Sequence, residues 1–170
     1  PYLDTIDNCK EKILALPSEK VSITSHDDLK LYATFYEYSK DAPIEILVHG
    51  YRSNSHRDMA IYILRALKLK HNALVIDQRA SGFSEGKVTT FGIKERYDVL
   101  SWANYLAEKF PNNKIILAGV SMGTATVLMA TGLDLPKNVW YVVADCGYSC
   151  IRSIITDVME KMHLPSKMLY

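Results

Sequence analysis

The sequence predicts an α/β fold, in which a mostly parallel, doubly wound sheet carries an antiparallel hairpin at its N-terminal side. Four short, nearly continuous apolar runs are typical of strands buried on both faces of a parallel sheet. They are "IEILVHG" (44–50), "ALVID" (73–77), "KIILAGV" (114–120) and "VWYVVAD" (139–145). Stretches of helical length separate them, at about 55–70, 92–109 and 122–132. Because strand and helix alternate along the chain, we expect right-handed crossovers between parallel strands.

The segment before the first of these strands predicts two further elements. Apolar residues recur at helical spacing from the start of the chain and stop at Pro17, which predicts a short helix. Stretches 21–24 and 29–38 flank a polar turn, and the second alternates and is rich in aromatic residues, which predicts an antiparallel hairpin. We therefore expect an N-terminal helical extension over residues 1–19 and a core over residues 20–170.

Composition excludes several classes of function. The chain has 170 residues, of which 48% are hydrophobic and 23% charged, as in an ordinary globular protein with one core. A net charge of +1 provides no basic field, so we expect no nucleic-acid partner. The three cysteines lack zinc-site spacing and no phosphate loop occurs, so we expect neither a metal nor a cofactor. No apolar stretch approaches the roughly 20 residues that span a bilayer, so we expect no membrane-spanning segment.

The first residue is Pro1 rather than Met, so we expect the sequence to be part of a longer chain. Three cysteines are too few and odd in number for a disulfide framework, which fits a reducing compartment. This favours a cytoplasmic protein. A membrane anchor or an export signal upstream of Pro1 is the alternative.

A Gly-x-Ser-x-Gly pentapeptide marks the candidate catalytic site. It comprises Gly119, Ser121 and Gly123 within "IILAGVSMGTAT", between an apolar run and a helical stretch. In a sharp strand-to-helix turn the serine adopts a strained backbone, and side chains at the flanking glycines would collide with neighbouring elements. The hydroxyl then lies at a helix N-terminus, whose partial positive charge stabilises an oxyanion. The pattern predicts Ser121 as a nucleophile; the alternative is a tight turn whose serine caps the helix.

A second donor for an oxyanion is predicted in "LVHGYRSNSHRD". His49 and Gly50 end an apolar strand, and Gly50 allows the chain to turn tightly. The N–H of Tyr51 is then expected to face the serine together with the N–H of Met122. We interpret His49 as part of the supporting loop, because a histidine at a strand end is more often a hydrogen-bonded structural group than a base.

Four stretches, "LVHGY", "LVIDQRASGFSEG", "IILAGVSMG" and "VVADCGYS", together resemble the α/β-hydrolase superfamily over about residues 20–155. Within it the chain is most similar to bacterial serine hydrolases of the esterase-like or serine-aminopeptidase-like kind. The resemblance implies a sheet of α/β-hydrolase type and acyl transfer by a Ser–His–acid triad. Ser121 would attack the carbonyl of a carboxylic ester or a related small acyl substrate.

The resemblance leaves the base and the acid of the triad open. Only an amphipathic helical stretch over 151–162 follows Asp145, so the seventh and eighth strands of the family pattern are missing. The core is thus expected to stop after the sixth strand and the start of a lid-region helix. Asp145 is a candidate acid, with a helix N-cap or turn residue as the alternative. His163 completes the order Ser–Asp–His, but its place beside a lid-region helix argues against a base.

Two interpretations follow. In the first, the chain is the N-terminal part of a serine hydrolase whose acid and base lie downstream, so that the chain alone is inactive. In the second, it is a non-catalytic α/β-hydrolase-like binding module or an inactive fragment, and an oligomer covers the open sheet edge. The apolar stripe that includes Met159, Met162 and Leu164 is interpreted as packed core, with the lining of an acyl pocket as the alternative.

Overall fold

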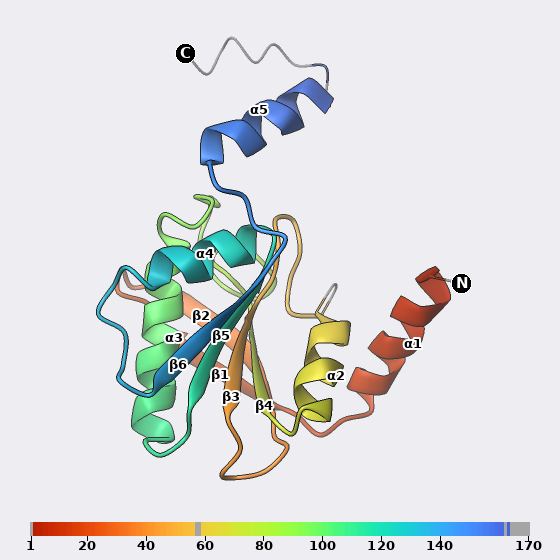
Figure 1. Ribbon diagram of the computed structural model, residues 1–170, viewed down its shortest axis with the longest axis vertical. Coiled ribbons are helices and arrows are strands. Elements are labelled where there is room, and N and C mark those ends of the chain that lie inside the picture. Colours follow the sequence, from red (N-terminus) through yellow and green to blue (C-terminus); the bar gives the residue numbers. More distant parts are fainter. Residues whose placement is uncertain (1, 57–58, 162, 164–170) are drawn as a thin grey trace.

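A computed structural model of the chain describes residues 2–56, 59–161 and 163 (Figure 1). Helices and strands alternate through most of it, as the apolar runs predict. The elements in chain order are α1 (Tyr2–Leu14), β1 (Glu19–Thr24), β2 (Lys30–Tyr36), β3 (Ile44–Val48), α2 (Ala60–Lys68), β4 (Asn72–Ile76), α3 (Glu95–Lys109), β5 (Ile115–Val120), α4 (Met122–Ala130), β6 (Val139–Asp145) and α5 (Ile151–Lys161).

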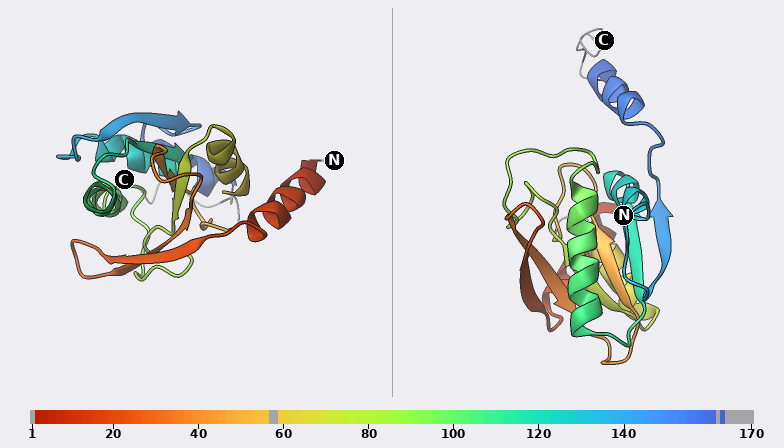
Figure 2. Two further views of the ribbon diagram at one scale, coloured as in Figure 1. Left: turned by 90° about the horizontal axis from the view of Figure 1, so that it is seen from below. Right: turned by 90° about the vertical axis from the view of Figure 1, so that its left-hand side faces the viewer.

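The strands form one six-stranded sheet in the order β1-β2-β4-β3-β5-β6. β1 pairs with β2, and β2 with β4, in antiparallel register. The pairs β3–β4, β3–β5 and β5–β6 are parallel. Helix α2 covers one face, and α3 and α4 cover the other, as Figures 1 and 2 show. The predicted doubly wound, mostly parallel sheet with its antiparallel hairpin is confirmed.

The central strands are apolar because helices cover both of their faces. Every residue of β3 and β4 is buried. On one face the sheet packs against Trp102 and Leu106 of α3 and Val127 of α4. On the other face it packs against Ile63 of α2, and Ile13 of α1 joins the same cluster. Two hydrophobic cores therefore hold the sheet from opposite sides.

β6 differs from the strand buried on both faces that its sequence predicts. Within the described chain it pairs only with β5, so it forms an edge of the sheet. Its Trp140 and Tyr141 remain 59% and 43% exposed. The Nζ atom of Lys114 lies 3.5 Å from the centroid of the Trp140 ring, which gives that ring a cation–π contact. The apolar residues of β6 therefore border solvent, because no described strand lies beyond them.

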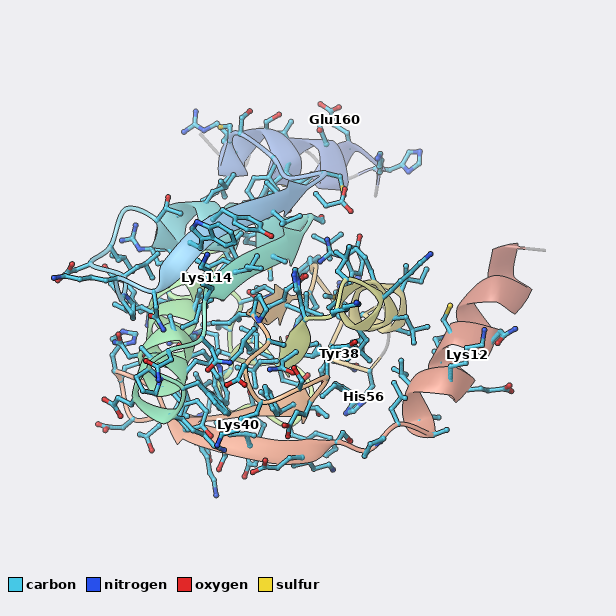
Figure 3. The ribbon with its side chains drawn as sticks, turned by 60° about the horizontal axis from the view of Figure 1, so that its bottom comes forward. Lys12, Tyr38, Lys40, His56, Lys114 and Glu160 are labelled. Atoms are coloured by element: carbon cyan, nitrogen blue, oxygen red, sulfur yellow. The ribbon has the colours of Figure 1, made fainter. Side chains whose placement is uncertain are left out.

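α5 stands beyond the carboxyl edge of the sheet, and Glu160 on it points away from the other elements (Figures 1 and 3). The described apolar side chains of this helix are half-buried, namely Ile151, Ile154, Ile155 and Met159. The interpretation of this stripe as packed core is therefore wrong for these residues. Met162 and Leu164, which belong to the same stripe, lie outside the described residues.

None of the helices in the described chain combines the length and the apolar character needed to cross a bilayer.

Candidate active site

The strand order brings two loops together at one crevice. β3 leads to α2 on one face of the sheet, whereas its parallel neighbour β5 leads to α4 on the other. Ligands of open α/β sheets bind where adjacent strands send their connections to opposite faces. Val48 of β3 pairs with Gly119 of β5. The loop that begins at His49 therefore meets the turn that contains Ser121.

Ser121 joins β5 to α4 in a strained conformation, with φ 54° and ψ −115°. Its N–H donates to the carbonyl of Asp145 at 2.9 Å, and its carbonyl accepts the N–H of Ala125 at 3.3 Å. Within the described chain its side chain forms no capping hydrogen bond on α4. The alternative of a serine that serves as a helix cap is therefore wrong, and the hydroxyl is not engaged by the helix that follows.

Gly119 and Gly123 are packed too tightly to carry a side chain. A Cβ on Gly119 would overlap the backbone of Gly123. A Cβ on Gly123 would in turn overlap the carbonyl of Val48 at the end of β3. The two glycines thus allow the first turn of α4 to lie directly against β5 and β3, which fixes the turn between them.

Gly50 brings the loop after β3 onto the serine. A Cβ on Gly50 would lie 3.5 Å from the Cβ of Ser121 and 4.0 Å from its Oγ. Tyr51 directly follows Gly50, and Met122 directly follows Ser121. Among the described residues, neither the N–H of Tyr51 nor that of Met122 has an acceptor. Two such donors flanking a serine hydroxyl are able to stabilise an oxyanion that forms beside it.

His49 is buried, and both nitrogens of its ring have partners. Nε2 accepts the backbone N–H of Gln78 at 3.1 Å, so Nδ1 carries the proton and donates to the carbonyl of Gly50 at 2.7 Å. The Gln78 side chain donates back to the carbonyl of His49 at 2.7 Å. The ring thus holds the loop after β3 against the loop after β4, and it offers Ser121 no free basic nitrogen.

The backbone of Asp145 supports the turn at Ser121. Its carbonyl accepts the N–H of Ser121, and its N–H donates to Thr124 Oγ1 at 3.0 Å. The carboxylate of Asp145 accepts a hydrogen bond of 2.7 Å from the hydroxyl of Tyr62. α5 begins only at Ile151, so Asp145 is not its N-cap. The other alternative, a turn residue, fits its place at the end of β6, directly before Cys146 with φ 44°.

Tyr62 is a residue of this site that the sequence did not indicate. It lies in the helical stretch after β3, where a tyrosine among apolar residues carries no signal of a polar partner. Burial, together with the hydrogen bond to Asp145 and the charge of that carboxylate, raises the pKa of Tyr62 above its ordinary value of 10.0. The phenol therefore remains protonated and donates to Asp145.

His163 does not approach the serine. It is exposed and lies just past α5, which stands beyond the carboxyl edge of the sheet (Figure 1). Across the described part of the chain, no histidine forms a hydrogen bond to Ser121. The structure therefore brings together Ser121, Gly50, Tyr51, Met122 and the backbone of Asp145, and none of the histidines it describes supplies a base to the serine.

One group of possible metal ligands lies outside this site. Single ligand atoms of His26, Asp27 and Asp98 all lie within 4.8 Å of one another. Buried Arg79 donates two hydrogen bonds of 2.7 Å to Asp98 and two of 2.9 Å to Asp27. The hydrogen bond from Arg79 holds the pKa of Asp27 well below its usual range. All four carboxylate oxygens already accept hydrogen bonds from the guanidinium of Arg79, so the group does not fit a metal ion.

Comparison with known proteins agrees with this geometry. A family model described as alpha/beta hydrolase fold matches residues 46–168. The esterase Pf2001 of Pyrococcus furiosus is 30% identical with a TM-score of 0.78, over 91% of this chain and 62% of the esterase. The uncharacterized protein YqkD of Bacillus subtilis (strain 168) is 31% identical over 129 residues, which are 74% of this chain and 42% of YqkD.

A putative hydrolase from Agrobacterium vitis S4 is 23% identical with a TM-score of 0.66, over 86% of this chain and 57% of that protein, and supports the fold alone. The chain thus spans less than two thirds of the length of each of these relatives. Because the family model covers most of the chain and the sheet has the expected order, the chain belongs to the alpha/beta hydrolase fold family.

Proposed function

We propose that the whole protein is a serine hydrolase that acts on a carboxylic ester or a related acyl substrate, with Ser121 as its nucleophile. The observation that carries this proposal is the strained turn at Ser121, with φ 54° between two glycines that are packed against the sheet. The 30% identity to an esterase over 91% of the chain supports an ester as the substrate.

In the proposed reaction, Ser121 Oγ attacks the carbonyl carbon of the ester and gives its proton to a base. The carbonyl oxygen becomes an oxyanion, which accepts hydrogen bonds from the N–H groups of Tyr51 and Met122. The tetrahedral intermediate then collapses and expels the alcohol, which takes the proton from the base. A water molecule then gives a proton to the base and attacks the acyl-enzyme, and the same two donors stabilise the second oxyanion. When this intermediate collapses, the bond to Ser121 Oγ breaks, the base returns the proton to Oγ, and the acid is released.

The proposal places the catalytic histidine in a further part of the whole protein, and its acidic partner there too unless Asp145 serves as the acid. Two observations support this placement: both ring nitrogens of His49 are engaged, and the esterase Pf2001 extends well beyond the 62% that this chain covers. Asp145 stays a candidate acid, since its carboxylate lies on the residue whose carbonyl holds Ser121. A base that bonds to this carboxylate would have to share it with the hydroxyl of Tyr62.

The test uses the full-length protein and its Ser121→Ala variant. A fluorophosphonate probe is expected to label the wild type at Ser121, and p-nitrophenyl acetate is expected to be hydrolysed. Ser121→Ala should lose the label and lower kcat about a thousandfold or more. Ser149→Ala, which alters an exposed serine after β6, is the matched control and should keep both activities. Undiminished ester hydrolysis by Ser121→Ala would refute the assignment.

A second measurement addresses the base. Residues 1–170 alone are expected to hydrolyse the ester at a small fraction of the full-length rate, because an oxyanion site without a base supplies only part of the catalysis. Rapid turnover by this shorter chain would contradict the placement of the base and direct the search to His163.

The open edge of β6 is the observation that favours the binding-module alternative. Its exposed Trp140 and Tyr141 would be covered either by a further part of the whole protein or by a second copy. Sedimentation of the full-length protein separates these cases, since a monomer would require the cover to come from the same chain. Full-length wild type that is neither labelled nor active would favour the binding module over the hydrolase.

A further inference from the structure

We infer that Tyr51, Phe91 and Tyr148 form an aromatic wall beside Ser121, and that this wall binds the apolar group of an ester substrate. The inference rests on the proposed function and adds a substrate class to it. The three residues come from three separate connections, namely the loop after β3, the loop before α3 and the segment after β6.

Direct contacts join the members of the aromatic wall. The rings of Tyr51 and Phe91 stack with centroids 5.2 Å apart and an interplanar angle of 30°. The hydroxyl of Tyr148 donates a hydrogen bond of 2.9 Å to the carbonyl of Phe91. Residues more than fifty positions apart in the chain are thus held as one surface.

Each aromatic residue adjoins a glycine that is packed against the serine turn or the helix that follows it. Gly50, before Tyr51, lies against Ser121 as described above. A Cβ on Gly147, before Tyr148, would overlap the methyl group of Thr124 in the first turn of α4.

The third glycine is Gly92, which follows Phe91. A Cβ on Gly92 would meet the Cα of Thr126 at 3.4 Å and the Sδ of Met129 at 3.1 Å, both on α4. The three glycines therefore lie against Ser121 and α4: Gly50 at the serine, Gly147 at the first turn of the helix and Gly92 further along it.

Polar contacts hold Phe91 in place. Its φ of 53° is unusual for a side chain of this size. The buried carboxylate of Glu95 accepts the N–H of Thr90 at 2.7 Å and the N–H of Gly92 at 2.9 Å, and thereby clamps the peptide on both sides of Phe91. Burial and the charge of Glu95 raise the pKa of Tyr148 to about 12, so its hydroxyl remains a donor to Phe91.

The exposed aromatic surface of the wall favours an apolar ligand. A substrate carbonyl held by the N–H of Tyr51 has its substituents within reach of the side chain of the same residue. That side chain is 44% exposed, and Phe91 and Tyr148 are half-buried, so aromatic surface remains open beside the carbonyl. An apolar group on the ester would cover this surface and remove it from water. The favoured substrates are therefore esters with a medium aliphatic or aromatic group.

The apolar group that the aromatic wall binds is either the acyl group of the ester or the group on its alcohol oxygen. Two series of esters distinguish these cases. In the full-length protein, kcat/KM is measured for p-nitrophenyl acetate, butyrate and octanoate, and separately for ethyl, butyl and benzyl acetate. Phe91→Ala removes the ring but keeps the carbonyl that Tyr148 uses. If the wall binds the acyl group, this variant should lower the ratio of kcat/KM for the octanoate to kcat/KM for the acetate about tenfold. If it binds the alcohol group, the corresponding ratio for benzyl acetate and ethyl acetate should fall by about the same factor. Phe91→Leu, which retains apolar volume, should restore most of that ratio.

Phe83→Ala is the matched control, because Phe83 lies on the same connection between β4 and α3, is 62% exposed and has the Nζ atom of Lys20 over its ring. It should leave both ratios unchanged. Ratios that stay constant in Phe91→Ala, with Ser121 still labelled by the fluorophosphonate, would overturn the aromatic wall and leave the proposed function standing.

A wild type that is not labelled would overturn the proposed function, and a binding measurement then judges the wall by itself. Octanoate is titrated calorimetrically into Ser121→Ala and into Ser121→Ala combined with Phe91→Ala. Binding that weakens about tenfold in the second protein supports the wall. Equal binding to both proteins, or no binding to either, overturns it.

Discussion

The hydroxyl of Tyr62 donates a 2.7 Å hydrogen bond to the carboxylate of Asp145, and so connects the first turn of α2 to the last residue of β6. The carbonyl of the same Asp145 holds the N–H of Ser121. Asp145 therefore accepts hydrogen bonds from α2, on one face of the sheet, and from the turn that leads to α4, on the other face. Asp145 thus links α2 to the serine turn through two hydrogen bonds.

Tyr62→Phe should lower the free energy of unfolding by about 1 kcal/mol, because it removes a hydrogen bond to a carboxylate that is itself exposed. Urea denaturation of the variant and the wild type measures this difference. Tyr141→Phe removes a hydroxyl from an exposed tyrosine of β6 and is the matched control. Equal losses in the two variants would show that the Tyr62 hydroxyl contributes no specific stabilisation.

Gly123→Ala should cost about 2–4 kcal/mol of unfolding free energy, because its methyl group would overlap the carbonyl of Val48. Gly132→Ala, after the end of α4, provides the comparison. A Cβ there meets the carbonyl of Met129 at an ordinary 3.5 Å, so the change should be within about 0.5 kcal/mol. Similar midpoints of thermal unfolding for both variants would contradict the packing of the serine turn.

Arg79→Met should destabilise the fold by about 3–5 kcal/mol, because it leaves the buried carboxylate of Asp98 without its cation. Combining it with Asp98→Leu removes the uncompensated charge and should recover most of that loss. Denaturant titration of the single and double variants tests the pair. A double variant no more stable than Arg79→Met would show that lost packing rather than charge is responsible.

Stability should fall in acid partly through Asp27, because the hydrogen bond from Arg79 holds the pKa of this carboxyl below its ordinary value of 3.8. A carboxyl with a lowered folded pKa stabilises the fold above its unfolded pKa, and that contribution disappears as pH falls toward the folded pKa. The difference in unfolding free energy between wild type and Asp27→Asn should therefore shrink from about pH 5 to about pH 3. For Asp134→Asn, an exposed control, the difference should stay constant.

The central strands and the serine turn were predictable because their signals are local. A strand covered on both faces is apolar along most of its length, and β3, β4 and β5 meet this condition, with Glu45 and Asn72 as the polar exceptions. The glycines at 119 and 123 follow from the close approach of α4 to two strands. The start of α2 was less predictable: the helical pattern begins near residue 55, but the Ser55 N–H donates to Asp77 at 2.8 Å, and the helix begins at Ala60.

Contacts between distant parts of the chain carried no such signal. The Tyr62–Asp145 pair spans 83 positions and the Arg79–Asp27 pair spans 52. Their polar groups were visible in the sequence, but their partners are decided by the order of strands in the sheet. The exposure of β6 was not predictable for a similar reason. An apolar run indicates that a strand needs other elements to cover it, but it does not show whether such elements are present.

The hydrogen bond from Ser121 to Asp145 also sets an order of events during synthesis. The ribosome releases the chain from its N-terminus, so β5 and α4 leave the exit tunnel before β6 does. Thr124 Oγ1 already has the carbonyl of Gly119 as a partner, but its contacts with the backbone of Asp145 require a residue 21 positions further along. Until β6 docks on β5, the N–H of Ser121 lacks its partner in the fold, and the packing of Gly119 and Gly123 alone constrains the turn with φ 54°. The serine turn of a nascent chain thus gains its last hydrogen bond only after β6 has emerged.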